Sequence, residues 1–298
     1  MSAESAAGAF QPNYVGRFAP SPTGSLHLGS LLAAVGSFVD ARHHGGRWLV
    51  RMEDLDTARV VPGCADEMLR ALEAFGLHWD GAIEYQSTRK HHYLEALTRL
   101  SERNLSYRCS CTRAERSAQG GYPGTCRSGA RLTGPTATRF RVADEPVRFA
   151  DRVQGECVFD LRQLGDVVVR RRDGTFAYQL AVVVDDGLQG VTDVVRGADL
   201  LDNTPWQLAL QRALDLPTPR YAHLPLVVEP RAGKLAKSRR SLPLVPAHAS
   251  VLLHEVLTLL GQAPTAELKS ELPERILAWA TGHWNLDAVA GIREVRAP

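Results

Sequence analysis

The sequence predicts an α/β protein built on a parallel β-sheet, because a strand, a loop, a helix and a second strand follow one another near its start. An apolar strand pattern at 14–18 leads into the loop 19–24, whose two prolines and one glycine exclude regular structure. Apolar residues at helical spacing then predict a helix over 27–42, and a compact apolar strand follows at 48–52. Such a unit is typical of a parallel sheet with both faces covered by helices.

The rest of the chain continues this alternation. Pro62 is suited to the first turn of a helix that reaches Phe75, with Gly76 as its stop signal. Periodicity fails over 106–135, which is rich in Cys, Gly, Ser and Thr and is expected to be an insertion without a core of its own. The run 176–186 is strongly apolar but yields no predicted element. The other elements expected are a helix at 91–103, strands at 138–142, 147–149 and 167–170, a strand at 192–197 leading into a helix at 203–214, a buried strand at 223–228, and two helices within 247–298.

Composition excludes several classes of protein. With 44% hydrophobic and 23% charged residues, the chain is typical of a soluble globular protein rather than a disordered one. No apolar run approaches the roughly 18–20 residues that span a bilayer, and residues 1–11 lack the features of a secretion signal. Five cysteines, an odd number, argue against a disulfide scaffold. We therefore expect a reduced, cytoplasmic protein that does not bind membranes.

The 298 residues are enough for one large domain or two modest ones. Residues 247–298 fall short of the roughly 100–150 residues of a typical domain, so we expect this region to pack on the main core. The division expected is a flexible tail at 1–13, the first half of the core at 14–104, an insertion at 105–135, the remainder of the insertion with the second half of the core at 136–246, and a short helical C-terminal region at 247–298.

Two loops are suited to binding phosphate. A helix that starts near His27, after a strand and a loop ending in Gly24, offers unpaired N–H groups and the positive end of its dipole to an anion. Only four of the 35 basic residues are lysines, yet Lys234 and Lys237 lie three positions apart beside Ser238. Their ammonium groups could neutralise a polyphosphate at the carboxyl edge of the sheet. A helix-capping histidine and a solvated surface loop are the simpler alternatives.

Four separated segments resemble one known family. Residues 17–30 (RFAPSPTGSLHLGS), 50–56 (VRMEDLD), 195–199 (VRGAD) and 234–238 (KLAKS) are similar, in order, to the catalytic core of glutamyl-tRNA synthetases, which are class I aminoacyl-tRNA synthetases. The similarity spans about three quarters of the chain. Two positions of the signature loops differ, since Ser30 replaces the second histidine of the first loop and Leu-Ala replaces Met-Ser in the second. The resemblance implies a Rossmann-like parallel-sheet core in which the first signature loop and a KMSKS-like loop bind ATP.

The resemblance also implies roles for individual residues. His27, Lys234 and Lys237 would be catalytic, with Lys237 stabilising the pentavalent phosphate during adenylate formation, and Mg²⁺ would accompany ATP. Arg17 and Arg196 could each bind a carboxylate of glutamate, and Glu53 could receive its ammonium group. The residues implied at the ATP site are Ser21, Thr23, Gly24, His27, Gly29, Ser30, Lys237 and Ser238, and those at the glutamate site are Arg17, Phe18, Ala19, Pro20, Ser21, Glu53, Tyr178 and Arg196.

The insertion carries candidate metal ligands. Cys109, Cys111 and Cys126 offer three thiolates in a segment without its own core, and zinc binding could fold such a segment. The spacing leaves the fourth ligand open. Related synthetases carry a Cys-x-Cys…Tyr…Cys site here, so the resemblance implies Tyr122 and one structural Zn²⁺. Unpaired reduced thiols in a loop are the alternative.

Only 60 residues follow Ser238, too few for the helical anticodon-binding domains of full glutamyl-tRNA synthetases. This architecture resembles a short branch of the family, the glutamyl-queuosine tRNA(Asp) synthetases. That resemblance implies a monomer that forms glutamyl-adenylate from L-glutamate and ATP without tRNA. It would then esterify glutamate to the cyclopentenediol of queuosine in the anticodon loop of tRNA(Asp). A shortened glutamyl-tRNA synthetase acting on the tRNA 3′ end and a non-catalytic tRNA-binding paralogue are the alternatives.

Overall fold

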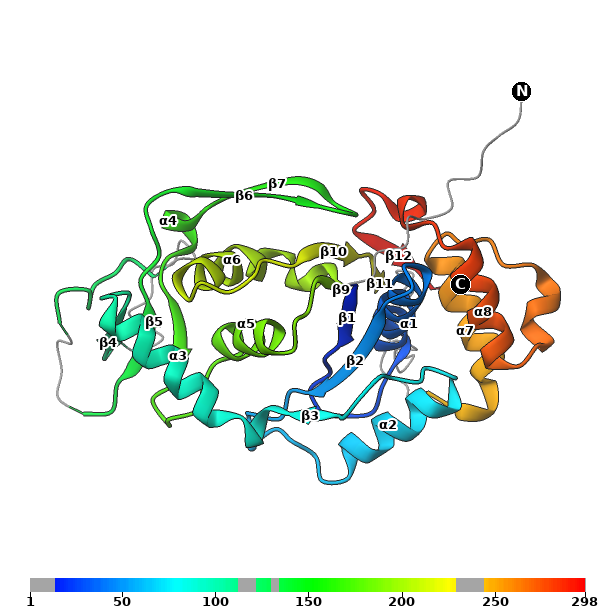
Figure 1. Ribbon diagram of the computed structural model, residues 1–298, viewed down its shortest axis with the longest axis horizontal. Helices are drawn as coiled ribbons and strands as arrows, with labels where there is room; N and C mark the ends of the chain where they lie inside the picture. Colours follow the sequence, from blue (N-terminus) through cyan, green and yellow to red (C-terminus); the bar gives the residue numbers. More distant parts are fainter. Residues whose placement is uncertain (1–13, 112–121, 130–133, 229–243, 298) are drawn as a thin grey trace, which may run out of the picture.

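Parallel strands form the centre of the fold. One set runs in the order β1-β2-β3, and a second set places β9 beside β10 and β10 beside β6, with β7 antiparallel to β6. The two sets meet where the Thr192 N–H donates to the Val15 carbonyl at 3.0 Å (Figure 1). The strands are β1 Val15–Phe18, β2 Arg47–Met52, β3 Glu84–Tyr85, β6 Pro146–Asp151, β7 Gly155–Asp160, β9 Asp193–Gly197 and β10 Arg220–Leu224. The computed structural model describes residues 14–111, 122–129, 134–228 and 244–297.

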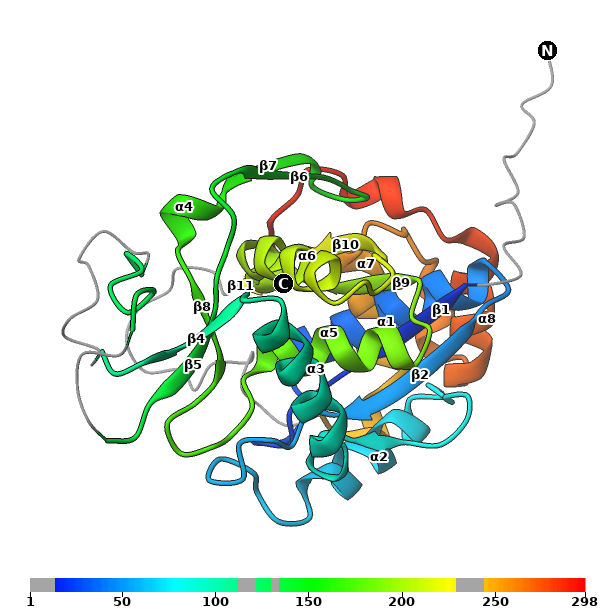
Figure 2. The same cartoon turned by 60° about the vertical axis from the view of Figure 1, so that its left-hand side comes forward.

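Helices cover both faces of the strands and enclose two apolar cores (Figures 1 and 2). Strand β2 divides its side chains between them, since Trp48 and Val50 belong to one core and Leu49 to the other, as the two-residue period of a strand requires. The first core includes residues of α1 Leu28–His43, α2 Cys64–Ala74, α7 Ala249–Leu259 and α8 Pro273–His283, and the second includes residues of α3 Lys90–Glu102, α5 Tyr178–Leu188 and α6 Thr204–Ala213. The predicted α/β class is confirmed.

A separate antiparallel sheet lies at one end of the molecule (Figure 2). Its strand order is β4-β5-β8, with bounds β4 Ser106–Cys109, β5 Ala137–Phe140 and β8 Val167–Arg170, and the short helix α4 Leu161–Leu164 precedes β8. The sequence predicts no strand at β4, which lies in the segment 106–135 without periodicity. This segment forms a strand because it pairs with β5, about 30 residues away in the chain, and not because of local periodicity.

Other predictions need correction. Helix α2 begins at Cys64 rather than at Pro62, because Gly63 has a φ of +79° and interrupts the helical backbone between them. The run 176–186 falls mostly in helix α5, and the expected strand 223–228 is divided by Pro225, which has no N–H for a sheet, into β10 and β11 Leu226–Val228. The remaining predicted strands and helices are confirmed to within a few residues.

The C-terminal region packs on the main core, as expected. Residues of α7 and α8 share the core of α1, and the Trp284 indole N–H donates to Asp40 of α1 at 2.9 Å. The sequence missed β12 Glu294–Arg296, which pairs in parallel with β11. In the part of the chain that is described, no helix combines the length and apolar character that crossing a bilayer demands.

Candidate active site

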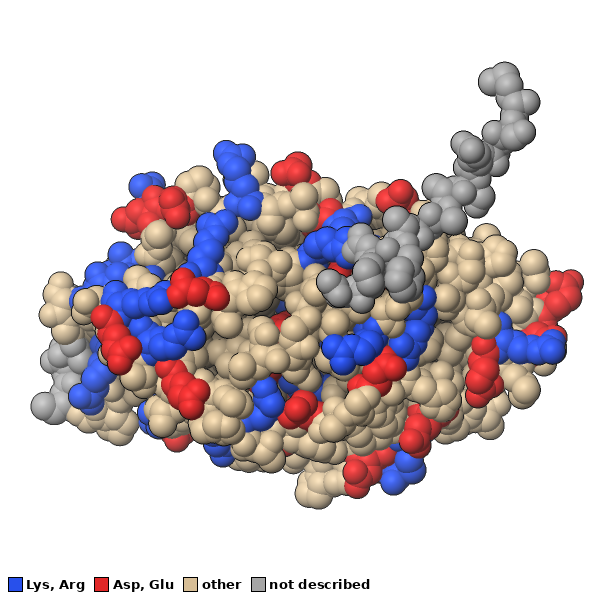
Figure 3. Space-filling model, in the orientation of Figure 1, with Lys and Arg blue, Asp and Glu red and all other residues tan. Residues whose placement is uncertain are grey.

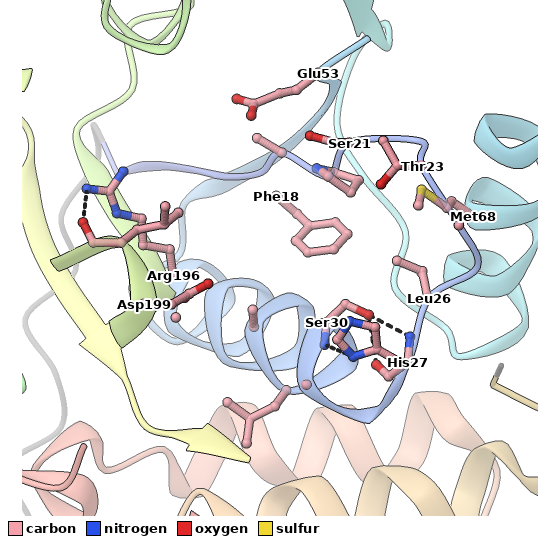
Figure 4. Close-up of a pocket in the computed structure, with 18 of the residues that line it drawn as sticks. Phe18, Ser21, Thr23, Leu26, His27, Ser30, Glu53, Met68, Arg196 and Asp199 are labelled. Carbon is pink, nitrogen blue, oxygen red and sulfur yellow. Dashed lines mark hydrogen bonds between the residues drawn. The ribbon is translucent and has the colours of Figure 1, made fainter. Parts of the chain in front are cut away.

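A cavity of about 670 Å³ opens at the carboxyl ends of the parallel strands (Figure 4). Phe18 ends β1, Glu53 follows β2, Gly197 ends β9 and Pro225 follows β10, and all four residues line the cavity. Ligands of open parallel sheets bind at this edge, and the loop that we expect to bind phosphate lines the cavity there.

The cavity brings together the residues predicted for the ATP and glutamate sites, as far as the structure describes them. They are Arg17, Phe18, Ala19, Pro20, Ser21, Thr23, Gly24, His27, Gly29, Ser30, Glu53, Tyr178 and Arg196. Lys234, Lys237 and Ser238 lie outside the described residues. Near the described ends of the segment that contains them, Val227 lines the cavity, and the Leu244 N–H donates to the carbonyl of Leu26, a lining residue, at 3.0 Å.

His27 caps helix α1 through its ring and its backbone. Its Nδ1 accepts from the Ser30 N–H at 3.3 Å, while its own N–H donates to the Ser30 hydroxyl at 2.7 Å (Figure 4). Because Nδ1 is an acceptor, the neutral ring carries its proton on Nε2, which is then a hydrogen-bond donor. Ser30, at the position of the second signature histidine, thus closes the cap. The capping contact and an anion-binding role are compatible.

The loop before α1 is held open by backbone contacts. The Pro20 carbonyl accepts from the Glu53 N–H at 2.9 Å, and the Pro22 carbonyl accepts from the Val61 N–H at 2.9 Å. Apart from its chain neighbours, no atom of the described residues lies within 4 Å of a Cβ built on Gly24. Among these residues, the space over Gly24 would let a ligand approach the backbone.

Buried charges gather beside Glu53. The Arg51 guanidinium donates to Asp186 at 2.8 Å, and Arg17 lies 3.4 Å from the same carboxylate. Burial acts to raise the pKa of Asp186, but Arg17 and Arg51 outweigh it and hold that pKa below its ordinary value. Burial raises the pKa of Glu53 to about 7, against the opposing effect of Arg51 and Arg17. Glu53 can therefore offer a negative charge to an ammonium group above that pH.

Arg196 lies across the cavity from the α1 N-terminus (Figure 4). Its Nη1 donates to the Tyr178 hydroxyl at 3.2 Å, and its Nη2 donates to Thr204 at 2.9 Å and to Gln207 at 2.8 Å. The same cavity thus has one end with guanidinium and carboxylate groups and another with helix N–H donors. An amino acid with two carboxylates fits the end with guanidinium and carboxylate groups, and a polyphosphate fits the end with helix N–H donors.

The predicted metal ligands also meet. The sulfur atoms of Cys109, Cys111 and Cys126 all lie within 4.8 Å of one another, and the Tyr122 hydroxyl is 3.4 Å from Cys109 and 3.5 Å from Cys111. Cysteine sulfurs at about 2.3 Å from a tetrahedral zinc ion are about 3.8 Å apart, so the donor set fits zinc in number, kind and spacing. The Arg139 guanidinium lies 3.8 Å from the centre of the Tyr122 ring and makes a cation–π contact with it.

Comparison with known proteins decides the family. The family model for the catalytic domain of class I tRNA synthetases (E and Q) matches residues 14–251. A protein from Ectopseudomonas mendocina named glutamyl-Q tRNA(Asp) synthetase is 52% identical over 91% of this chain and 93% of its own length. The chain belongs to the glutamyl-Q tRNA(Asp) synthetase family. A member from Pseudomonas aeruginosa is 52% identical over 92% of this chain and 94% of its own length. Membership confirms the predicted resemblance and makes the chain a ligase.

A solved structure confirms the fold. The crystal structure of a glutamate tRNA ligase from Elizabethkingia meningosepticum in complex with its amino acid has a TM-score of 0.80 and 24% identity, with 96% of this chain and 67% of that chain covered. At this identity the likeness concerns the fold alone. The parallel-sheet core of class I synthetases is therefore the fold of this family member.

Sequence analysis missed several residues around the site. Arg51 and Asp186 form its main buried ion pair, and Gln207 holds Arg196. Two of these positions had a visible signal, because Arg51 is a charge within an otherwise apolar strand and Asp186 is the second of two acidic residues that end an apolar run. Gln207 had none, since a glutamine in a helix is usually exposed.

Proposed function

We propose that this chain activates L-glutamate with ATP and Mg²⁺ without tRNA and transfers it to the queuosine of tRNA(Asp). A carboxylate oxygen of glutamate attacks the α-phosphorus of ATP and pyrophosphate leaves. A hydroxyl of the queuosine cyclopentenediol then attacks the acyl carbon, loses its proton, and AMP leaves. The choice of acceptor is supported by the relatives named for tRNA(Asp) at 52% identity.

One observation carries the first step, namely the single cavity with two chemically different ends. Arg17 and Arg196 would bind the carboxylates of glutamate, and Glu53 would bind its ammonium group. His27 and the N–H groups of α1 would bind ATP phosphates, with Mg²⁺ bridging phosphate oxygens. Lys237, with Lys234, would add positive charge as the pentavalent phosphate forms.

Transfer of radiolabelled glutamate tests the acceptor. Because the diol is the proposed nucleophile, tRNA(Asp) that contains queuosine should accept about one glutamate, and matched tRNA(Asp) lacking queuosine should accept almost none. Equal labelling of both tRNAs would contradict the proposal and would favour a shortened glutamyl-tRNA synthetase that charges the 3′ end. A non-catalytic paralogue would label neither.

Charge on the surface bears on how tRNA binds. On the face in Figure 3, basic side chains gather toward the end of the molecule that holds β4 and β5, but acidic side chains lie among them. The formal net charge is only +2. We therefore expect modest tRNA affinity that falls as salt rises, because phosphate contacts release counterions. The monomeric state and the cytoplasmic location stay predictions.

We also propose that Cys109, Cys111, Tyr122 and Cys126 hold one structural zinc ion. Metal analysis of protein purified with reductant should give about one zinc per chain, and Cys111→Ser should reduce it because one thiolate is lost. Cys157→Ser is the matched control, since Cys157 is also buried but lies outside the cluster. Absence of zinc from the folded, reduced protein would contradict this proposal.

A further inference from the structure

A buried series of hydrogen-bonded side chains lies behind the cavity and runs from Asp151 through His223 to Arg196. The Arg196 Nε–H donates to His223 Nε2 at 3.0 Å, and His223 Nδ1 lies 2.6 Å from Asp151 Oδ2. The side chains of His223 and Asp151 are both 0% exposed, and neither residue lines the cavity. Any effect of these two residues on the site is therefore transmitted through Arg196.

The hydrogen bonds define the proton positions along this chain. Since Arg196 Nε–H is always a donor, His223 Nε2 must accept, which places the imidazole proton on Nδ1. That proton is then donated to Asp151. Burial lowers the pKa of His223, although Asp151 acts to raise it, so the ring is neutral and this tautomer is the one the neighbours require.

Asp151 cannot turn away from His223. Its Oδ1 accepts three backbone N–H groups, those of Val153 at 3.0 Å, Gln154 at 2.9 Å and His223 at 3.1 Å. Only Oδ2 is directed at the imidazole. The backbone between β6 and β7 thus fixes the carboxylate, the carboxylate fixes the ring, and the ring fixes Arg196 Nε.

The other contacts of Arg196 leave one nitrogen for a ligand. Nη2 is used by Thr204 and Gln207, whereas Nη1 has the Tyr178 hydroxyl as its partner among the described residues. Nη1 carries two N–H groups, so a second one is available there. With Nε and Nη2 held from behind, the guanidinium plane has little freedom to rotate, and Nη1 with Tyr178 faces the cavity.

We propose that Asp151 and His223 are positioning residues that orient Arg196 toward a carboxylate of the amino-acid substrate. This inference rests on the proposed function, because it takes glutamate as the ligand of Arg196. A purely structural role explains the buried Asp151–His223 pair less well, since burying polar groups costs free energy that apolar side chains of similar size avoid. The expected effect is specific, because the ATP end of the cavity does not contact Arg196.

Asp151→Asn tests the proton arrangement. The three N–H groups at Oδ1 require the amide oxygen there, so the amide NH₂ must face His223 Nδ1. The imidazole proton then moves to Nε2 and meets the Arg196 Nε–H, donor against donor. In glutamate-dependent ATP–pyrophosphate exchange, the KM for glutamate should rise about ten- to hundredfold, as expected for one lost charge-assisted hydrogen bond. The KM for ATP should stay at its wild-type value.

Two substitutions of His223 form a matched pair. The amide of His223→Gln reaches the position of Nε2 and can accept from Arg196, so the KM for glutamate should stay close to that of the wild type. The shorter amide of His223→Asn reaches only the position of Nδ1 and contacts Asp151, so this KM should rise. His254→Gln is the control, because His254 is a buried histidine bonded to the Thr265 carbonyl, outside the site.

The outcomes separate this inference from the proposed function. Wild-type protein without glutamate-dependent exchange would contradict the proposed function. An active wild type with an unchanged glutamate KM in Asp151→Asn, or with both KM values raised equally, would overturn the positioning role. If Asp151→Asn does not fold, the two His223 variants decide. Equal KM values for glutamate in His223→Gln and His223→Asn, both as thermally stable as the wild type, would overturn the positioning role.

Discussion

Replacing Arg196 by alanine should abolish most glutamate activation. The change removes a carboxylate-binding guanidinium and leaves its buried partners Thr204, Gln207 and His223 without their donor. Losing one partner of a buried charged contact costs about 2–5 kcal/mol, so kcat/KM for glutamate in pyrophosphate exchange should fall by about 1.5 to 3.5 orders of magnitude. Arg196→Lys should also be impaired, because an ammonium group cannot contact all these partners at once.

Arg103→Ala is the matched control for this prediction. Arg103 donates to Asp215 and to the Ala213 carbonyl at the surface, and it does not line the cavity. Its exchange kinetics should equal those of the wild type. A folded Arg196→Ala protein with near-normal kcat/KM for glutamate would show that Arg196 does not bind the amino acid.

Replacing Asp40 by alanine should strongly destabilise the fold. This buried carboxylate of α1 accepts from Tyr14, from Trp284 at 2.9 Å and from Arg152 at 2.6 and 2.9 Å, and thereby joins β1, the C-terminal region and the β6–β7 hairpin. Burial acts to raise the pKa of Asp40, but Arg152 and the other hydrogen-bond donors outweigh it and hold that pKa below its ordinary value. Without Asp40, the free energy of unfolding should fall by about 3–5 kcal/mol in urea titrations.

Asp215→Ala provides the comparison for Asp40. Asp215 also pairs with arginines, Arg99 and Arg103, but its side chain is 63% exposed. Solvent screens such pairs, so the loss should be far smaller than for Asp40. Equal losses in the two variants would contradict the role assigned to the buried contact.

The fold was predictable where local pattern and tertiary structure agree. The strand at 48–52 and the helix at 27–42 were predicted because apolar spacing is set by the core that each element faces. Strands β4 and β12 were not, because they have only four and three residues and their partners β5 and β11 are distant in the chain. Pairing with a distant strand is a tertiary effect that a local window does not contain.

The lining of the candidate site was predictable from motifs, whereas the residues behind that lining were not. Residues that face the cavity, such as Arg17, Glu53 and Arg196, stand in motifs that resemble a known family. Asp151 and His223 lie outside those motifs and act from the side of the core. Their contacts depend on how β6 and β10 pair, which no short segment specifies.

Pyrophosphate exchange in the absence of RNA tests the central claim most directly, namely that one cavity activates glutamate with ATP by itself. The purified protein, free of nucleic acid, should exchange labelled pyrophosphate into ATP when L-glutamate is present, with saturation in glutamate and no response to L-glutamine. Exchange that requires added tRNA, or that is equal without glutamate, would contradict the account.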